Sequence, residues 1–238
     1  MSKHPVVLTG VFVLALSLLS GGAAFARSYA TTFPLPETPL SEGGNWTGGK
    51  TTGLDWADVA TTPGFAFGTQ TGSGGYDDST ALLSGSWGPD QSVTATVHTV
   101  NQTGGKVYEE VEIRLRSALA PHRNTGYEIN FRCLRNSSSY VQIVRWNGPL
   151  GDFTYLADEK GVLKGIKDGD VLRATIKGNV ITAYINGVKV AQAADNTFAG
   201  GSPGIGFFIQ GAAGVNRDFG FTRITASDEA DTPPAPSP

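Results

Sequence analysis

Apolar and polar residues alternate with a period of two along most of the chain. Clear runs lie at 91–100, 107–116, 125–134, 140–146, 170–178, 179–187, 188–194, 204–211 and 219–226, and looser ones at 64–69 and 79–85. A period of two sends successive side chains to opposite faces of a strand. No convincing helical period interrupts the series between Arg27 and Ala226. The pattern therefore predicts an all-β domain built as a sandwich or a barrel.

Turn residues support this prediction. Asn186-Gly187 separates two alternating runs, and both residues of such a pair readily take the positive φ that a type I′ hairpin turn requires. Gly178-Asn179 separates the preceding pair of runs in the same way. We therefore expect 170–194 to form an antiparallel meander of three strands.

The two ends of the chain lack the alternation. A basic start is followed by an apolar run from Val6 to Leu19 and by small residues that end in Ala26, which is the pattern of a secretory signal peptide. The last residues carry four prolines and no apolar period, which is typical of a flexible tail. We predict a signal peptide at 1–26, one domain at 27–226 and a tail at 227–238. The mature chain is then secreted, either extracellular or periplasmic.

Composition and charge exclude several partners. Charged residues make up 16% of the chain, against about 25% in an average soluble protein, and the net charge is −3. Removal of a signal peptide that contains Lys3 makes the mature chain −4 (−3 − 1). Nucleic acid and anionic membranes need a concentrated basic surface, so neither is expected as a partner. We expect a monomer.

Cys133 is the single cysteine of the chain. An intramolecular disulfide and a cysteine-rich zinc site are therefore excluded, and stability must come from burial of a core. Cys133 falls on the apolar side of its own run, which predicts a core residue rather than a nucleophile.

The runs 107–116, 125–134 and 140–146 each have one apolar and one polar face. If they are neighbouring antiparallel strands, their apolar residues form one buried layer. That layer consists of Val111, Ile113, Leu115, Tyr127, Ile129, Phe131, Cys133, Val141 and Ile143. The opposite face carries Glu110, Glu112, Arg114, Arg116, Glu128, Asn130, Arg132, Gln142, Val144 and Trp146, and the runs 91–100 and 204–211 add Thr94, Thr96, His98, Phe208 and Gln210.

This second face differs from ordinary solvated surface, which favours Lys, Ser and Thr. Carboxylates, amides and guanidinium groups can hydrogen-bond pairs of hydroxyls, and Trp146 can stack on the apolar side of a pyranose ring. The face is therefore a candidate carbohydrate platform. The alternative is that its glutamates and arginines only pair across strands, each pair contributing about 0.2–1 kcal/mol. The two interpretations are compatible.

Several segments together resemble the concanavalin A-like lectin/glucanase superfamily, and more narrowly its secreted bacterial members. They are SEGGNWTGG (41–49), YEEVEIRLRS (108–117), TGYEINFR (125–132), YVQIVRWNGPLGDFTYL (140–156), ITAYINGVKV (181–190) and GSPGIGFFIQG (201–211). The resemblance covers roughly residues 31–226. It implies a two-sheet antiparallel jelly-roll sandwich with sugar bound on the concave sheet, but it does not fix an activity.

The glucanase branch of this superfamily carries E-x-D-x-E or E-x-D-x-x-E on one strand, with the first Glu as nucleophile and the last as acid/base. The nearest match here is Glu110-Val111-Glu112, and Arg114 stands where the acid/base is needed. A retaining glycosidase needs two carboxyls about 5–5.5 Å apart. Glu128 on the next run is the remaining candidate for the second carboxyl. If the chain is an enzyme, these three glutamates are its candidate catalytic residues.

A jelly-roll polysaccharide lyase is a second enzymatic alternative. EIRLRS and VQIVR are faintly similar to the arginine-rich strand and the Q-[IV]-H segment of alginate lyases, but Arg145 replaces the histidine. His98 or His122 would then be the base, because the pKa of histidine suits proton transfer.

The hypothesis that the sequence favours is a carbohydrate-binding, lectin-like domain that recognises a polysaccharide or oligosaccharide. Its candidate binding residues are His98, Arg114, Arg116, Asn130, Arg132, Gln142 and Trp146. Polysaccharide cleavage is the alternative, and an adhesion or protein-interaction module is the third. We expect no cofactor, with calcium left open at acidic pairs such as Asp77-Asp78, Asp168/Asp170 and Asp55/Asp58, none of which matches an EF-hand loop.

Overall fold

The computed structural model describes residues 26–73, 75–102, 104–211 and 214–228. Nearly all of the predicted signal peptide and most of the predicted tail lie outside these residues. No helix in the described part of the chain is long and apolar enough to span a membrane.

The described residues form two antiparallel sheets. One sheet contains β1 (Ser28–Thr31), β3 (Val59–Thr62), β4 (Phe65–Gly68), β6 (Gln91–Thr99), β11 (Val171–Lys177), β12 (Val180–Ile185), β13 (Val188–Ala194) and β15 (Phe219–Ser227). The other contains β2 (Trp46–Gly48), β5 (Ser79–Leu83), β7 (Tyr108–Ala120), β8 (Arg123–Arg132), β9 (Tyr140–Gly148), β10 (Phe153–Lys160) and β14 (Ser202–Gln210). Three short 3-10 turns join them, at Lys50–Thr52, Val162–Lys164 and Asn216–Asp218.

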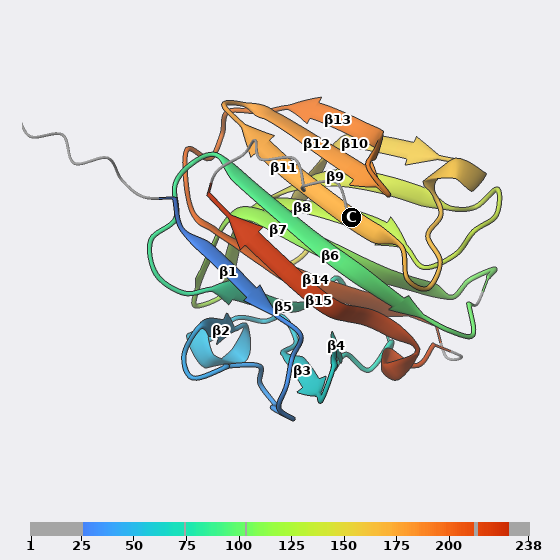
Figure 1. Ribbon diagram of the computed structural model, residues 1–238, viewed down its shortest axis with the longest axis horizontal. Helices are drawn as coiled ribbons and strands as arrows, with labels where there is room; N and C mark the ends of the chain where they lie inside the picture. The colour runs from blue at the N-terminus through green and yellow to red at the C-terminus, as the bar shows by residue number, and fades with distance from the viewer. Residues whose placement is uncertain (1–25, 74, 103, 212–213, 229–238) are drawn as a thin grey trace, which may run out of the picture.

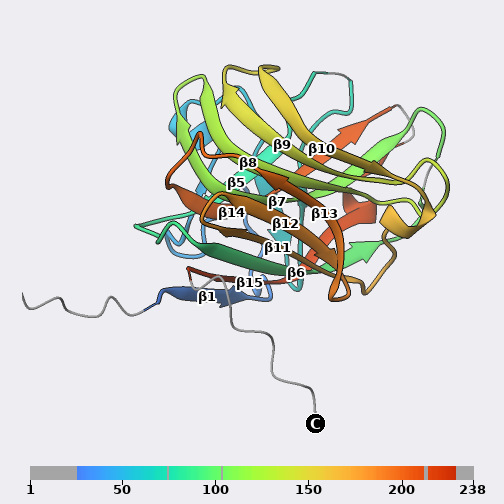
Figure 2. The same cartoon turned by 90° about the horizontal axis from the view of Figure 1, so that it is seen from above.

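The sheets lie face to face as two layers (Figures 1 and 2). The strand order of the eight-stranded sheet is β13-β12-β11-β6-β15-β4-β3, with β1 paired to β15. The seven-stranded sheet has the order β10-β9-β8-β7-β14-β5-β2. The expected all-β, two-sheet antiparallel sandwich is therefore confirmed.

The core fills the space between the layers. Alternate residues of β7, β8 and β9 point into it, and the whole apolar layer expected for these strands is buried, including Cys133 at 1% exposure. Burial also raises the pKa of the Cys133 thiol, which keeps it protonated and unreactive. Residues of β6, β11 and β12 supply the facing half of the core.

The meander β11-β12-β13 is confirmed, and Asn186 and Gly187 have φ of 50° and 79°, as a type I′ turn requires. Strands β7, β8 and β9 are antiparallel neighbours, also as expected. The sequence pattern did not reveal β1, β2, β3 or β10. In β10 a bulge between Tyr155 and Ala157 shifts the register and interrupts the alternation of apolar and polar residues.

Candidate functional site

The outer face of the seven-stranded sheet carries a cavity of about 370 Å³. This volume lies in the range of small-molecule sites, about 300–1,000 Å³. Its polar lining consists of Asp78, Glu110, Glu112, Glu128, Asn130, Arg132, Ser138, Gln142, Lys160 and Gln210. Its apolar and aromatic lining consists of Tyr76, Tyr108, Tyr140, Val144, Trp146, Phe153, Tyr155 and Phe208.

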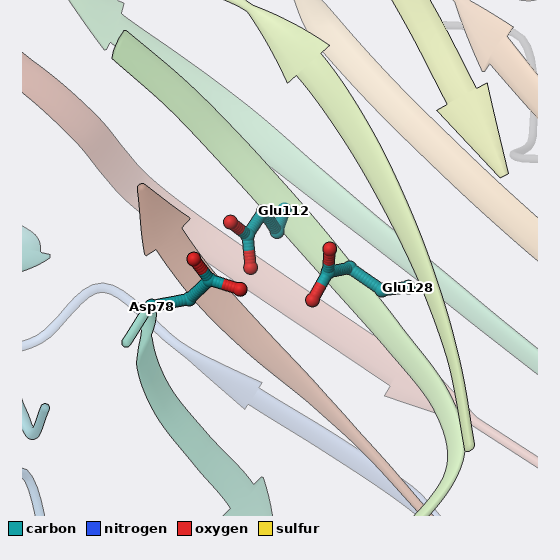
Figure 3. A group of neighbouring side chains, drawn as sticks. All are labelled: Asp78, Glu112 and Glu128. Carbon is teal, nitrogen blue, oxygen red and sulfur yellow. The ribbon is translucent and has the colours of Figure 1, made fainter. Parts of the chain in front are cut away.

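Strand register brings the polar residues together. Glu112 on β7 lies opposite Asn130 on β8, and Arg114 lies opposite Glu128, so the alternation of β7 places both pairs on the outer face. Asp78 is the residue just before β5, and β5 is two strands away from β7, on the other side of β14. Figure 3 shows the carboxylates of Asp78, Glu112 and Glu128 pointing toward one another from these elements.

Arg114 holds this carboxylate group together. Its Nη2 atom lies 2.5 Å from Glu128 Oε2, 2.8 Å from Glu112 Oε2 and 3.5 Å from Asp78 Oδ2. All four side chains are almost completely buried. A guanidinium that contacts three carboxylates compensates at most one of their three negative charges. The remaining charge must be removed by protons or by a ligand, because isolated buried charges are very costly.

Gly206 of β14 makes room for this ion-pair group. Gly206 lies opposite Glu112 in the register of β14 with β7. A Cβ atom at this position would overlap Glu112 Oε2 and would lie 3.1 Å from both Nε and Nη2 of Arg114. The absence of a side chain at Gly206 therefore lets the two side chains lie flat over the neighbouring strand.

The acids of the site hold their protons more tightly than ordinary carboxyls. Burial raises the pKa of Glu110 from 4.5 to about 7, with Glu128 adding to the shift and a hydrogen bond from Tyr140 opposing it. Burial and then the negative charge of Glu128 also raise the pKa values of Asp78 and Glu112 well above their ordinary range, although Arg114 opposes both shifts. At neutral pH the site therefore contains protonated as well as ionised acids.

Glu110 is hydrogen-bonded to an aromatic residue and an amide of the cavity lining. It accepts a hydrogen bond from the Tyr140 hydroxyl and another from Asn130. Arg132, its partner across β7 and β8, donates instead to the backbone oxygens of Ser138 and Val107, at 3.0 and 2.9 Å. The Arg132 guanidinium also lies over the Tyr108 and Tyr140 rings, at 4.4 and 5.5 Å from their centroids.

Trp146 lies in the cavity lining, as expected, but in a different role from the stacking platform predicted for it. Its side chain is 2% exposed, packs edge-on against Trp56 at 5.1 Å, and donates from Nε1 to Glu128 Oε2 at 2.7 Å. The accessible rings of the cavity are those of Tyr76 and Tyr155, at 49% and 53% exposure. These two rings both contact Phe153, which links them into one aromatic wall.

The structure corrects two predicted site residues. His98 lies on β6, which belongs to the eight-stranded sheet between β11 and β15, and it pairs there with Asp168 at 3.0 Å. The prediction that His98, Thr94 and Thr96 share one continuous outer face with the residues of β7, β8 and β9 is therefore wrong. Arg116 is the second correction: it has a positive φ of 45° at a register shift of β7 and turns away from the cavity.

The Arg116 side chain is part of the scaffold instead. It donates to the backbone oxygens of Pro89, Gly178 and Phe198, at 2.5, 2.7 and 3.1 Å. These three segments lie at strand ends and loops of the sandwich. Arg116 therefore fastens the loops around one end of the domain.

The structure brings Glu110, Glu112, Glu128, Asn130, Arg132, Gln142 and Trp146 together in the cavity lining, with Arg114 buried against its acids. Sequence reasoning named Asp78 only in the pair Asp77-Asp78 considered for calcium, and it missed Tyr76, Tyr140, Phe153 and Tyr155. The aromatic residues Phe153 and Tyr155 share one face of the DFTYL segment, which is a signal that the pattern contained. Nothing local to Tyr76 or Asp78 indicated that their loop lies beside β14.

The acidic residues considered for calcium have other partners. Asp168 and Asp170 accept hydrogen bonds from the backbone nitrogens of Thr99 and Lys167, each at 2.9 Å. Asp58 accepts one from Lys50 at 2.9 Å. In the part of the chain that the structure describes, the carboxylates of Asp78, Glu112 and Glu128 are near enough to share a cation, and the Arg114 guanidinium supplies positive charge there.

No protein-family model and no curated protein matches the chain. Among solved structures, the chain is similar to the carbohydrate-binding module CBM66 from Bacillus subtilis, with 20% identity, 72% of this chain and 95% of that chain covered, and a TM-score of 0.51. It is also similar to the carbohydrate recognition domain of Emp47p, with 14% identity, 82% of this chain and 95% of that chain covered, and a TM-score of 0.50. A third similar structure is a GlcNAcα1-4Gal-releasing endo-β-galactosidase from Clostridium perfringens, with 10% identity, 87% of this chain and 64% of that chain covered, and a TM-score of 0.51. At these identities the likeness establishes the concanavalin A-like jelly-roll fold.

Proposed function

We propose that this chain, which has a concanavalin A-like jelly-roll fold, binds carbohydrate in the cavity on the outer face of its seven-stranded sheet. The observation that carries the proposal is the combination of an aromatic wall and a polar floor in one cavity. Tyr76, Phe153 and Tyr155 offer ring surfaces, while Glu110 and Asn130 offer fixed polar groups. Sugars present both apolar ring faces and hydroxyls, so they need this combination.

The names of the similar structures support the same proposal. Two of them are carbohydrate-binding domains and one is an enzyme that releases a disaccharide. Because fold alone does not determine function, the proposal depends on the cavity rather than on this likeness. A protein-interaction module, the third alternative, has less support because a walled cavity suits a small ligand better than a flat protein surface does.

Binding is tested by screening the purified chain on a glycan array and then measuring the best ligand by calorimetry. Tyr155→Ala should weaken binding about five-fold or more, since a lost ring contact costs about 1 kcal/mol. The matched control is Tyr184→Ala on β12 of the other sheet, which should leave affinity unchanged. Equal losses in both variants, or no glycan bound at all, would count against the proposal.

Glycoside hydrolysis is a second candidate, and one observation favours it. A general acid must be protonated near neutral pH, and burial raises the pKa of Glu110 to about 7. Glu128, which contacts Arg114 and accepts a hydrogen bond from Trp146, is the candidate for the second carboxyl that hydrolysis would need. Release of reducing ends that Glu110→Gln abolishes would establish it. A lyase has less support, because His98 and His122 are absent from the cavity lining and pair with Asp168 and Asp55.

We also propose that the mature chain is secreted, acts as a monomer and needs no cofactor to bind sugar. The alternating domain, its acidic net charge and the signal-peptide pattern support secretion without membrane or nucleic-acid partners. Calcium is tested by repeating the binding titration in EDTA. A loss of affinity that added calcium restores would replace the cofactor-free proposal.

A further inference from the structure

The polar floor of the cavity contains more acids than bases. Four carboxyl groups line it, from Asp78, Glu110, Glu112 and Glu128. The one arginine buried among them is Arg114, which contacts three of the four.

The other two cations of the lining offset only part of this excess, and the charge of Arg132 opposes the rise in the pKa of Glu110. Arg132 directs its Nη atoms to backbone oxygens and stacks on Tyr108 and Tyr140. Lys160 is 66% exposed and pairs with Asp158 at 2.8 Å, outside the floor. If all four carboxyls of the floor are ionised, the two buried guanidinium groups of Arg114 and Arg132 compensate only part of their charge, and protons or a cationic ligand must supply the rest.

Two buried oxygen atoms of the floor lack a donor. Glu112 Oε1 and Asn130 Oδ1 have no hydrogen-bond partner, and both residues line the cavity and are more than nine-tenths buried. Leaving a buried acceptor unsatisfied costs free energy, so a ligand that donates hydrogen bonds gains by filling these positions. Three buried guanidinium nitrogens, Arg114 Nε and Nη1 and Arg132 Nε, also lack a partner. The two oxygen atoms can be satisfied only by a ligand that donates.

An ammonium group has the properties that these observations require. It carries three donors, no acceptor and one positive charge. The three donors match Asn130 Oδ1, Glu112 Oε1 and the carboxyl group of Glu110. Glu110 lies two residues before Glu112 on the same face of β7, and it is hydrogen-bonded to Asn130 of β8. The faces of the aromatic wall also attract cations, and Arg132 already lies over two tyrosine rings of the same cavity.

We propose that the ligand of this cavity is an amino sugar, a saccharide unit with a free rather than acetylated amine, whose ammonium binds at Glu110, Glu112 and Asn130. This inference depends on the proposed carbohydrate-binding function and names its ligand class. The sugar ring lies against the aromatic wall, and the ammonium replaces protons that the buried acids otherwise hold. Anionic glycans, such as uronates and sulfated sugars, are excluded from the floor by its acids.

The test compares three tetrasaccharides by isothermal titration calorimetry at pH 6: a glucosamine oligomer, its N-acetylated counterpart and a neutral glucose oligomer. We expect the glucosamine oligomer to bind at least ten-fold more tightly than the other two, since a charge-assisted hydrogen bond to a buried carboxylate is lost in both. Repeating the titration in buffers of different ionisation enthalpy should show proton release on binding of this oligomer alone. Glu110 is protonated at this pH, and an ammonium beside it favours its ionised form.

Two variants locate the effect. Glu110→Gln keeps the shape of the side chain and removes its charge, so it should abolish most of the preference for the free amine and most of the proton release. The control is Glu159→Gln on β10, an exposed acid outside the cavity lining, which should change neither. Circular dichroism of each variant shows whether it is folded, and loss of preference in a folded Glu110→Gln supports the proposal.

The outcomes separate the two proposals. If the acetylated or neutral oligomer binds as tightly as the glucosamine oligomer, the amino-sugar inference is overturned while carbohydrate binding stands. If pentylamine binds as tightly as the glucosamine oligomer, the site recognises a simple amine and the amino-sugar inference is overturned. If none of the sugars binds and the glycan array is also blank, the carbohydrate-binding function itself is overturned.

Discussion

Arg114 Nη2 lies 2.5 Å from Glu128 Oε2, across the strand pair β7 and β8. The same nitrogen atom also contacts Glu112 and Asp78, so one guanidinium joins three strands of the sheet, counting the loop that leads into β5. Buried ion pairs of this kind contribute little net stability over an apolar replacement, but removing one partner leaves uncompensated charge. The floor of the cavity and the stability of the fold therefore depend on the same residue.

Arg114→Met should destabilise the protein by about 3–5 kcal/mol at pH 7, the cost of breaking a buried pair. Urea unfolding measures this difference. Lowering the pH to 5 should recover part of the loss, because burial raises the pKa values of Asp78 and Glu112 and a lower pH further favours their uncharged forms. The control is the exposed Arg223→Met on β15, which should change stability by less than about 0.5 kcal/mol. A loss of the same size at both pH values would contradict the role assigned to Arg114.

Stability of the unmodified protein should fall as pH rises from about 4.5 to 7. The folded-state pKa of Glu110 is raised from 4.5 to about 7 by burial, so the folded protein binds more protons than the unfolded chain in this interval. The shift of about 2.5 pKa units corresponds to a loss of up to roughly 3 kcal/mol, with Asp78 and Glu112 acting in the same direction. The pKa values of Asp158 and Asp195 are lowered in the folded protein, so these two residues affect stability only below this pH interval.

Urea unfolding at pH 5, 6, 7 and 8 measures the dependence. Glu110→Gln cannot titrate at this position and should therefore show a shallower decline than the unmodified protein. A stability that is constant between pH 5 and 8, or a decline of identical slope in Glu110→Gln, would show that Glu110 does not hold its proton in the folded state.

The sequence predicted the faces of β7, β8 and β9 because each strand alternates without interruption and one face is strongly apolar. Glu110, Glu112, Glu128, Asn130 and Trp146 followed from this alternation, and the cavity lining contains all five. Wherever one face of a strand is buried, a shift of one residue would expose the whole core set, so the pattern fixes which side chains share a face.

The sequence could not predict which sheet β6 belongs to. β6 has the same alternation as β7, yet it pairs with β11 and β15, so His98 lies in the other layer. Alternation in a single strand carries no information about its neighbours, and the turn residues Asn101 and Gly104-Gly105 between β6 and β7 do not show whether the two strands pair in one sheet or lie in different layers. Arg116 was wrongly assigned to the site for a different reason: a positive φ at this non-glycine residue ends the alternation within the strand.

Arg116→Ala should lower stability by about 2–4 kcal/mol and leave sugar affinity unchanged. Its guanidinium donates to three backbone oxygens, and hydrogen bonds to charged groups each contribute about 1.5–3 kcal/mol. Thermal or urea unfolding gives the stability, and calorimetry with the ligand from the array gives the affinity. An affinity loss in a fully folded Arg116→Ala would return this residue to the binding site.

Gly206→Ala should disturb the acid cluster although it adds one methyl group. The new Cβ would overlap Glu112 Oε2 and lie 3.1 Å from Arg114 Nε, in a space where both side chains are completely buried. We expect a loss of about 1–3 kcal/mol, the usual cost of overpacking, with weaker ligand binding because Glu112 is displaced. Gly200→Ala is the matched control, since a Cβ there meets nothing within 4 Å. Urea unfolding measures the stability of both variants, and calorimetry measures their ligand affinity. If Gly206→Ala is as stable and binds as tightly as Gly200→Ala, the close approach of Glu112 and Arg114 to β14 does not determine the shape of the cavity floor.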